Sequence, residues 1–350
     1  MRRLLITLAA LTVLAAGAAL YVLFQLTILN PPVAQPSFFD ARKAKAYVES
    51  TIIPGIDTYE RTAMAGGGEV FHAGRVGRPV LLIPDLGAGA WAFAPYLKTL
   101  GGSNRLDALD FGVLAPTTTL EDLTATARRA LTDLHARTAE EIFLVGEGAG
   151  SLVALKLLDE APEYIAGVAL LSPYTPRERS DQQQWLSDVI GDFIYGPVMA
   201  SRQSMSDYWA KNFPSALVQP RLATKYASLS AQRPFATLPL VREVTYGRLA
   251  WLPGAYTRLK GLGLPVLHLF ARYDTLNPID SQKALADDLA ASLGGRYSRG
   301  LFNSGRMLSL DWRWRETSVV LGEWLRTNAL SAPYEDAETL LEPGVKPASY

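Results

Sequence analysis

The chain has 350 residues, in which 34 Lys and Arg balance 34 Asp and Glu, with three His and no Cys. The zero net charge excludes a nucleic-acid binder that works through a basic face, because neutralising phosphates needs a clustered surplus of Lys and Arg. Without Cys the chain has no disulfides, no thiolate nucleophile, no thiolate metal site and no lipidated cysteine. Charged residues make up 19% of the chain, below the roughly 25% of an average soluble domain.

This charge deficit lies at the N-terminus, which predicts a transmembrane signal anchor over residues 1–30. Arg2 and Arg3 are followed by no charged residue until Asp40, and the apolar run 4–29 is long enough to cross a hydrocarbon core of about 30 Å. The Arg pair places the N-terminus in the cytoplasm. We therefore expect a single-pass protein of the cell membrane whose main domain is periplasmic or extracytoplasmic.

A cleaved signal peptide is the alternative, because Ala16-Gly17-Ala18 resembles a small-residue cleavage site. Cleavage there would leave a mature chain that begins with the exposed apolar run ALYVLFQLTIL, which favours the uncleaved anchor. Residues 31–60, which begin with a Pro-rich stretch, are then a linker or N-terminal arm.

Residues 61–328 predict one α/β domain with a doubly wound, mostly parallel sheet. Short apolar runs without alternation are typical of parallel strands that are covered on both faces. Four such runs occur, at Val80–Ile83, Ile142–Val145, Val168–Leu171 and Val266–Phe270. Helical stretches lie between them, at Leu120–Ala136, Ser151–Leu158 and Ser281–Leu293.

The strand pattern breaks at about residues 175–262, where aromatic residues are scattered and no clear strand is found. We interpret this segment as a helical cap inserted over the carboxyl edge of the sheet. Its aromatic residues either form the core of the cap or line an apolar pocket or a partner surface. The acidic, Pro-containing residues 329–350 predict a flexible C-terminal tail.

The string Gly146-Glu147-Gly148-Ala149-Gly150 follows a predicted strand and precedes a helix, as a nucleophile elbow does. The chain resembles the α/β-hydrolase superfamily from about Val70 to Leu325. PVLLIPDLGAG resembles the first core strand with its oxyanion loop, and LPVLHLFARYD resembles the strand that carries the acidic triad residue, which would be Asp274. The resemblance implies the fold, whereas activity must be judged from the site.

The catalytic residues that the resemblance implies are missing. Gly148 stands in the nucleophile position and has no side chain with which to form an acyl intermediate. All three histidines precede Asp274, and the position expected for the base holds Arg306, which stays protonated near neutral pH. We expect Arg306 instead to form an ion pair with Asp274.

The oxyanion loop differs as well, because Pro84-Asp85 stands where the resembling hydrolases carry His-Gly. A carboxylate there would oppose the developing negative charge of a hydrolytic transition state. The elbow is similar to that of the N-myc downstream-regulated family, whose members are regarded as inactive, so we predict a non-catalytic member with a degenerate triad.

The remaining expectations concern binding. We expect Asp85, Leu86, Glu147 and Gly148 to lie at the mouth of the former pocket, with no metal and no cofactor required; a cation held by Asp85 and Glu147 is a weaker alternative. The predicted role is that of an accessory subunit of a membrane complex or of a binder of an apolar ligand. The alternative is an active lipid esterase or acyltransferase that uses Ser151 as a displaced nucleophile.

Overall fold

The structure is a computed structural model with two compact units, Met1–Ala34 and Gln35–Tyr350. It describes residues 58–85, 88–112, 114–115, 117–175, 249–272, 279–311 and 313–336, with 12, 15, 17, 18, 240, 243, 274 and 277 as isolated positions. The four in the first unit are helical, and the predicted anchor otherwise lies outside the described residues. No helix within the described residues combines the length and apolar composition needed to cross a membrane.

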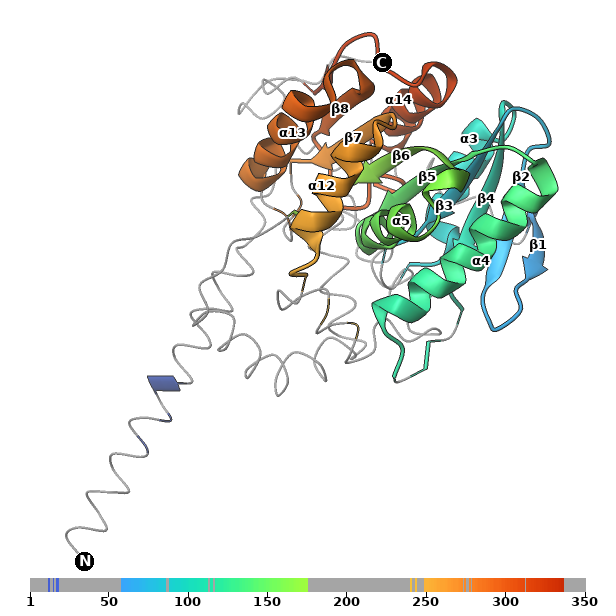
Figure 1. Ribbon diagram of the computed structural model, residues 1–350, viewed down its shortest axis with the longest axis horizontal. Helices are drawn as coiled ribbons and strands as arrows, with labels where there is room; N and C mark the ends of the chain where they lie inside the picture. Colours follow the sequence, from blue (N-terminus) through green and yellow to red (C-terminus); the bar gives the residue numbers. More distant parts are fainter. Residues whose placement is uncertain are drawn as a thin grey trace, which may run out of the picture. The chain divides into compact units, whose positions relative to one another are not determined.

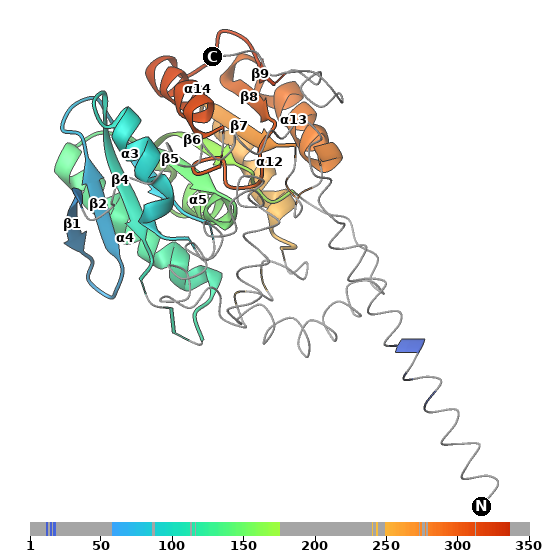
Figure 2. The ribbon, with the colours of Figure 1, turned by 180° about the vertical axis from the view of Figure 1, so that it is seen from behind.

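Within the described part of the second unit, one sheet has the strand order β1-β2-β4-β3-β5-β6-β7-β8-β9 (Figures 1 and 2). The first two pairs along this order are antiparallel and all later pairs are parallel. The strands are β1 (Glu60–Ala63), β2 (Glu69–Ala73), β3 (Arg78–Ile83), β4 (Asn104–Asp110), β5 (Ile142–Glu147), β6 (Ile165–Leu171), β7 (Val266–Ala271), β8 (Tyr297–Phe302) and β9 (Tyr334–Glu335).

Helices cover both faces of this sheet, as the two opposite views show (Figures 1 and 2). The helices α4, α5, α12 and α13 share one apolar core, and η2, α3 and α14 share the other. Their bounds are η2 (Ala90–Phe93), α3 (Ala94–Leu100), α4 (Leu120–Thr138), α5 (Ala149–Glu160), η3 (Pro162–Tyr164), α12 (Leu252–Leu262), α13 (Ile279–Leu293), η5 (Gly294–Arg296) and α14 (Trp314–Thr327).

The central strands explain why the sequence folds in this way. Successive side chains of a strand point to opposite faces, and here both faces are apolar. Leu81 and Leu144 pack in the core beneath α4 and α5, whereas Leu82 and Val145 pack in the core beneath α3 and α14. Each of the four apolar runs predicted as a strand lies within an observed strand, and the predicted helices lie within or across α4, α5 and α13.

Two predicted boundaries differ from the structure. Helix α12 contributes buried residues to the core shared with α5, so the sheet-covering part of the domain resumes before residue 262 and the predicted cap range extends too far. Between 176 and 248 only Leu240 and Glu243 are described, so the cap itself lies outside the described residues. The predicted tail contains strand β9, which pairs parallel with β8, so the predicted boundary at residue 328 lies before the last strand of the sheet.

The buried polar residue Asp336 explains why this segment is ordered. Its carboxylate accepts a hydrogen bond from the Asn303 backbone N–H at 2.8 Å and from Nε of Arg313 at 2.9 Å. Tyr334 packs its ring on Phe302 with 4.7 Å between the ring centroids. A sequence reading based on acidic and Pro composition could not detect these partners, which lie more than twenty positions away along the chain.

The three histidines have structural partners away from the triad position. His268 is fully buried on β7, where its two ring nitrogens lie 3.0 Å from Tyr297 Oη and 3.0 Å from Gln282 Oε1. Burial lowers the pKa of His268 from 6.5 to about 4, so the ring is neutral at physiological pH. His72 lies in the edge hairpin on β2, and His135 lies in the last turn of α4.

Candidate functional site

The turn between β5 and α5 has the backbone of a nucleophile elbow. Gly148 lies at its tip with φ 55° and ψ −118°, a conformation that costs about 1–3 kcal/mol for residues with a side chain. A Cβ on Gly146 would lie 2.5 Å from the carbonyl oxygen of Gly150, and a Cβ on Gly150 would lie 2.1 Å from that of Ile83. These close approaches require the two flanking glycines, so the turn is kept although the residue at its tip, Gly148, has no side chain.

The carboxyl group of Asp85 fills the space that a nucleophile would need. A Cβ built on Gly148 would lie 2.1 Å from Cγ of Asp85 and 2.2 and 2.4 Å from its two carboxylate oxygens. Asp85 lies two residues beyond β3 and is 2% exposed. Gly148 and Asp85 are therefore complementary, because the missing side chain of one leaves room for the carboxylate of the other.

The same carboxylate also binds the backbone donor that an active hydrolase of this fold would use. The N–H of the residue after the nucleophile stabilises the oxyanion in such enzymes. Here that residue is Ala149, the first residue of α5, and its N–H donates to Oδ1 of Asp85 at 2.7 Å. The partial positive charge at the start of the helix favours this arrangement. A resident negative charge thus already occupies the oxyanion position.

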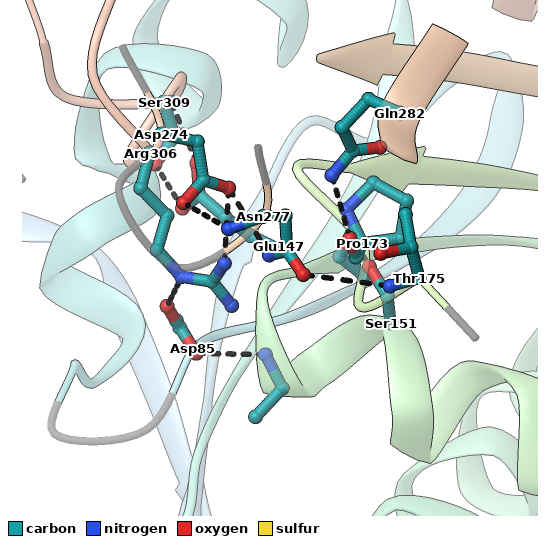
Figure 3. A network of polar contacts seen from close by, with 12 residues as sticks. Asp85, Glu147, Ser151, Pro173, Thr175, Asp274, Asn277, Gln282, Arg306 and Ser309 are labelled. Atoms are coloured by element: carbon teal, nitrogen blue, oxygen red, sulfur yellow. Dashed lines mark hydrogen bonds and ion pairs between the residues drawn. The ribbon is translucent and has the colours of Figure 1, made fainter. Parts of the chain in front are cut away.

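Arg306 joins Asp85 to the acidic triad position. It follows β8, and its side chain is completely buried. Its Nε donates to Oδ2 of Asp85 at 2.8 Å and its Nη1 donates to Oδ2 of Asp274 at 3.1 Å (Figure 3). The guanidinium also lies 4.6 Å from the centre of the Tyr174 ring, within the range of a cation–π contact. The predicted ion pair between Arg306 and Asp274 is confirmed, and Asp85 is a second partner that was not predicted.

Asp274 is held in place by the turn that follows β7. The backbone N–H of Asn277 donates to its Oδ1 at 3.1 Å, and the side-chain amide of Asn277 donates to its Oδ2 at 3.1 Å. The Thr175 N–H donates to the amide oxygen of Asn277 at 3.4 Å, which links this turn to the segment that follows β6. Asn277 was missed by sequence reasoning, although its position three residues after an Asp at a strand end is typical of an Asx-type turn.

Glu147 is completely buried at the end of β5. Its carboxyl oxygens accept from the Ser309 N–H at 2.9 Å and lie 2.5 Å from Ser309 Oγ. Burial raises the pKa of Glu147 from 4.5 to about 8; the Ser309 hydrogen bonds and the charge of Arg306 oppose this rise, and the charge of Asp85 adds to it. The carboxyl group therefore carries its proton at neutral pH, and Asp85 and Asp274 share the charge of Arg306.

The loop that carries Arg306 is fixed by two further buried carboxylates. Asp311 accepts from Ser304 Oγ at 3.0 Å and from the Gly305 N–H at 2.6 Å. Asp336 accepts a hydrogen bond from the N–H of Asn303, the residue that directly precedes Ser304. The position of the guanidinium therefore depends on a rigid loop, as well as on its two partners.

The predicted site residues do not lie at the mouth of a pocket, the position expected from the sequence. Asp85, Glu147 and Gly148 do lie together, but the two carboxyl groups are buried and point into the protein, and Leu86 lies outside the described residues. Ser151 is also fully buried, and its Oγ donates to the Gly146 carbonyl oxygen at 2.7 Å. Among the described residues, no three His, Asp or Glu side chains form a group that could hold a metal ion.

The strand order, the elbow, and the positions of Asp274 and Arg306 after β7 and β8 define an α/β-hydrolase fold. No protein-family model matches the chain. Among solved structures, the chain is similar to a thermophilic esterase from Thermogutta terrifontis, with a TM-score of 0.59, 16% identity, and 77% of this chain and 100% of the esterase covered.

Two further similar structures are a meta-cleavage product hydrolase and a bacterial membrane phospholipase A. The hydrolase has a TM-score of 0.58 and 17% identity over 77% of this chain and 98% of its own. The phospholipase has a TM-score of 0.55 and 15% identity over 94% of this chain and 99% of its own. At these identities the similarity establishes the fold, and the named activities belong to those proteins.

Proposed function

We propose that this chain is a non-hydrolytic protein with the α/β-hydrolase fold that works by binding. In this proposal it is either an accessory subunit of a membrane complex or a binder of an apolar ligand. The observation that carries the proposal is the position of Asp85, whose carboxylate fills the space beside Gly148 and accepts the Ala149 N–H. A substrate carbonyl would have to displace this buried charge and would then meet no nucleophile.

The position of Arg306 supports the same proposal. A general base must accept a proton near neutral pH, which a guanidinium cannot do. Arg306 is paired with two carboxylates, so the group in the position of the base stabilises a fixed arrangement of charges. The nucleophile, the oxyanion donor and the base are thus each replaced or blocked by residues that contact one another.

The proposal places the domain outside the cytoplasm, held at the cell membrane by residues 4–29. The apolar run behind Arg2 and Arg3 supports this location. The similarity to a membrane phospholipase A, which covers 94% of this chain, is compatible with a protein that works at a membrane. Carbonate extraction of native membranes tests the location, because an anchored chain stays in the pellet whereas a cleaved chain is released.

The second candidate function is an active lipid esterase or acyltransferase. The names of the similar structures favour it over an inactive protein, because they are an esterase, a hydrolase and a phospholipase. Its nucleophile would be Ser151, whose hydroxyl is buried and hydrogen-bonded to the Gly146 carbonyl. This candidate requires the start of α5 to rearrange so that the hydroxyl reaches a substrate and a base.

A fluorophosphonate probe and a panel of fatty-acid esters separate the two candidates. We expect the full-length chain in detergent to show no labelling and no ester turnover above its heat-denatured control. Ser151→Ala is the matched variant, because it removes one hydroxyl from a small buried position. Labelling of the wild-type chain that is lost in Ser151→Ala would overturn the non-hydrolytic proposal in favour of the esterase.

Purification from native membranes in mild detergent separates the two binding roles. An accessory subunit would copurify with a stoichiometric protein partner, which mass spectrometry would identify. A ligand binder would instead elute alone and release a lipid on extraction with organic solvent. Elution alone, without protein or lipid, would contradict both roles.

A further inference from the structure

The two helical faces of the sheet differ in how their surface charges are paired. On the face formed by α4, α5, α12 and α13, cations form ion pairs with acidic residues of neighbouring helices. These pairs are Arg128–Glu160, Lys156–Glu121, Arg258–Asp159 and Lys260–Asp288. On the face formed by α3 and α14, Lys98 and Arg326 are exposed and have no ion-pair partner among the described residues.

The outer side of α14 is positively charged along most of its length. Arg315, Val319 and Arg326 are exposed and recur at helical spacing, so they project from one side of the helix over about 16 Å. The two acidic residues of α14 are only partly exposed and already have partners. Glu316 accepts from the arginine three residues before it at 2.8 Å, and Glu323 accepts from a serine hydroxyl at 3.1 Å.

This stripe of α14 continues onto α3, which lies beside it (Figure 2). A Cβ built on Gly322, in the middle of the stripe, would lie 3.0 Å from Cδ2 of Leu100, the last residue of α3. The hydroxyl of Tyr96 also donates to Oγ1 of Thr317 at 2.7 Å and joins the two helices beneath the surface. Lys98, between Tyr96 and Leu100, therefore extends the positive surface.

The turn between β2 and β3 extends the same surface further. A Cβ built on Gly74 would lie 2.2 Å from the carbonyl oxygen of Gly101, directly after α3, so this turn packs on the end of that helix. The turn presents Arg75 and Val76 to solvent. Among the described residues, the exposed large apolar side chains are Val76, at 63%, and Val319, at 68%, and both belong to this surface. The basic face is defined by Arg75, Val76, Lys98, Arg315, Val319 and Arg326.

We propose that the basic face is a docking surface for an anionic phospholipid bilayer. This inference rests on the proposed location at the membrane and specifies which side of the domain meets the lipid. Basic residues are attracted to the negative potential of such a bilayer, and apolar side chains between them enter its headgroup region. A protein interface is typically centred on aromatic anchors instead, whereas Trp314 and Trp324 of α14 are buried.

Quenching of a site-specific fluorescent label by lipids tests this orientation. The chain has no Cys, so Val319→Cys carries a single label, and Thr132→Cys is the matched control at an exposed position of α4 on the opposite face. Each labelled full-length chain is reconstituted, one per nanodisc, with doxyl-labelled lipid in phosphatidylcholine or in an equal mixture of phosphatidylcholine and phosphatidylglycerol. We expect quenching of Val319→Cys in the anionic nanodiscs only, weakened by sodium chloride, and none of Thr132→Cys.

The double variant Lys98→Gln/Arg326→Gln, made in the Val319→Cys chain, tests the role of charge. It should lower the ratio of docked to undocked chain, read from the quenching, by roughly 30-fold. Arg128→Gln/Lys283→Gln is the matched control, because it removes the same number of exposed charges from α4 and α13 on the opposite face. It should leave the ratio unchanged, and circular dichroism checks that both double variants are folded.

Equal quenching of Val319→Cys in the two lipid compositions would overturn the inference, as would equal quenching of Val319→Cys and Thr132→Cys. Equal losses in the two double variants would also overturn it. Coelution of the chain with the nanodiscs reports the anchor separately. A chain that does not coelute would count against the anchor, and its label is then tested with preformed vesicles of the same two compositions. None of these results bears on hydrolysis, which the fluorophosphonate experiment tests.

Discussion

Two regions of the sheet each have one part of a hydrolytic site: the carboxyl end has the backbone turn, and the antiparallel edge has the side chains. At the carboxyl end, the elbow and the Ala149 N–H are present, but the side chains are Gly148, Asp85 and Arg306. At the edge, His72 lies with Nδ1 2.8 Å from Asp107 Oδ1 and Nε2 2.9 Å from Thr62 Oγ1.

The edge thus has the order of groups in a catalytic triad, namely hydroxyl, imidazole and carboxylate. These residues stand on the paired strands β1, β2 and β4 rather than at a strand-to-helix turn, and Asp107 also pairs with Arg137. The carboxyl end of the sheet therefore has the backbone of an elbow without triad side chains, whereas the edge has triad-like side chains without an elbow.

The largest effect that we predict follows from removing Arg306. Arg306→Ala would leave Asp85 and Asp274 buried without their shared guanidinium, which should cost about 3–5 kcal/mol of unfolding free energy. Urea unfolding followed by circular dichroism measures it. Arg326→Ala removes an exposed cation from the last turn of α14 and is the control, which should cost far less.

A loss below about 1 kcal/mol for Arg306→Ala would contradict the structural role assigned to this residue. Arg306→Lys sharpens the result, because an ammonium group retains the charge but cannot bind two carboxylates with the same planar geometry. It should lie between the wild type and Arg306→Ala in stability.

The next prediction concerns Glu147 and pH. Its folded-state pKa of about 8 lies above the ordinary 4.5, so the folded chain retains a proton that the unfolded chain loses. The contribution of this bound proton to the free energy of unfolding is fully present below pH 4.5. It is lost as the pH rises to about 8, at roughly 1 kcal/mol per pH unit. The free energy of unfolding of Glu147→Gln, measured relative to that of wild type, should therefore increase as the pH rises from 4.5 to about 8.

Urea unfolding of the two chains at pH 5, 6.5 and 8 measures this difference. Glu121→Gln is the matched control, because it removes a carboxylate from the exposed surface of α4. A difference between Glu147→Gln and wild type that stays constant with pH would contradict the buried, protonated state of Glu147.

The smallest predicted effect on stability concerns His72, at the antiparallel edge of the sheet. His72→Ala removes a partly exposed contact with Asp107, and such surface pairs contribute about 0–1 kcal/mol. It should reduce the unfolding free energy by no more than this and should leave fluorophosphonate labelling at background. Ester turnover in wild type that disappears in His72→Ala would show that Thr62, His72 and Asp107 form a working catalytic site.

The sequence predicted most of the fold because its signals are local. Apolar runs such as Val168–Leu171 mark buried parallel strands, and the glycines around Gly148 mark the tight turn. It also predicted the Arg306–Asp274 pair, because the fold dictates which strand ends meet. It could not predict that Asp85 enters the space beside Gly148, since that depends on the separation of two loops in three dimensions.

Other features were missed for the same reason. The partner of Glu147 is Ser309, which lies 162 positions away in the chain. Strand β9 has only two residues, and its order depends on the burial of Asp336 against the loop after β8. Long-range polar partners of this kind leave no periodic pattern in a single sequence.

A double-mutant cycle of Gly148→Ser and Asp85→Ala tests most directly whether the Asp85 carboxylate occupies the place of the nucleophile. Gly148→Ser alone should be strongly destabilising, because its Cβ would meet the carboxylate, and much of that cost should disappear in the Asp85→Ala background. We predict a coupling free energy of about 1–3 kcal/mol from urea unfolding, whereas Gly102→Ser, at an open position, should be additive with Asp85→Ala. Additivity of Gly148→Ser and Asp85→Ala within about 0.5 kcal/mol would contradict the account.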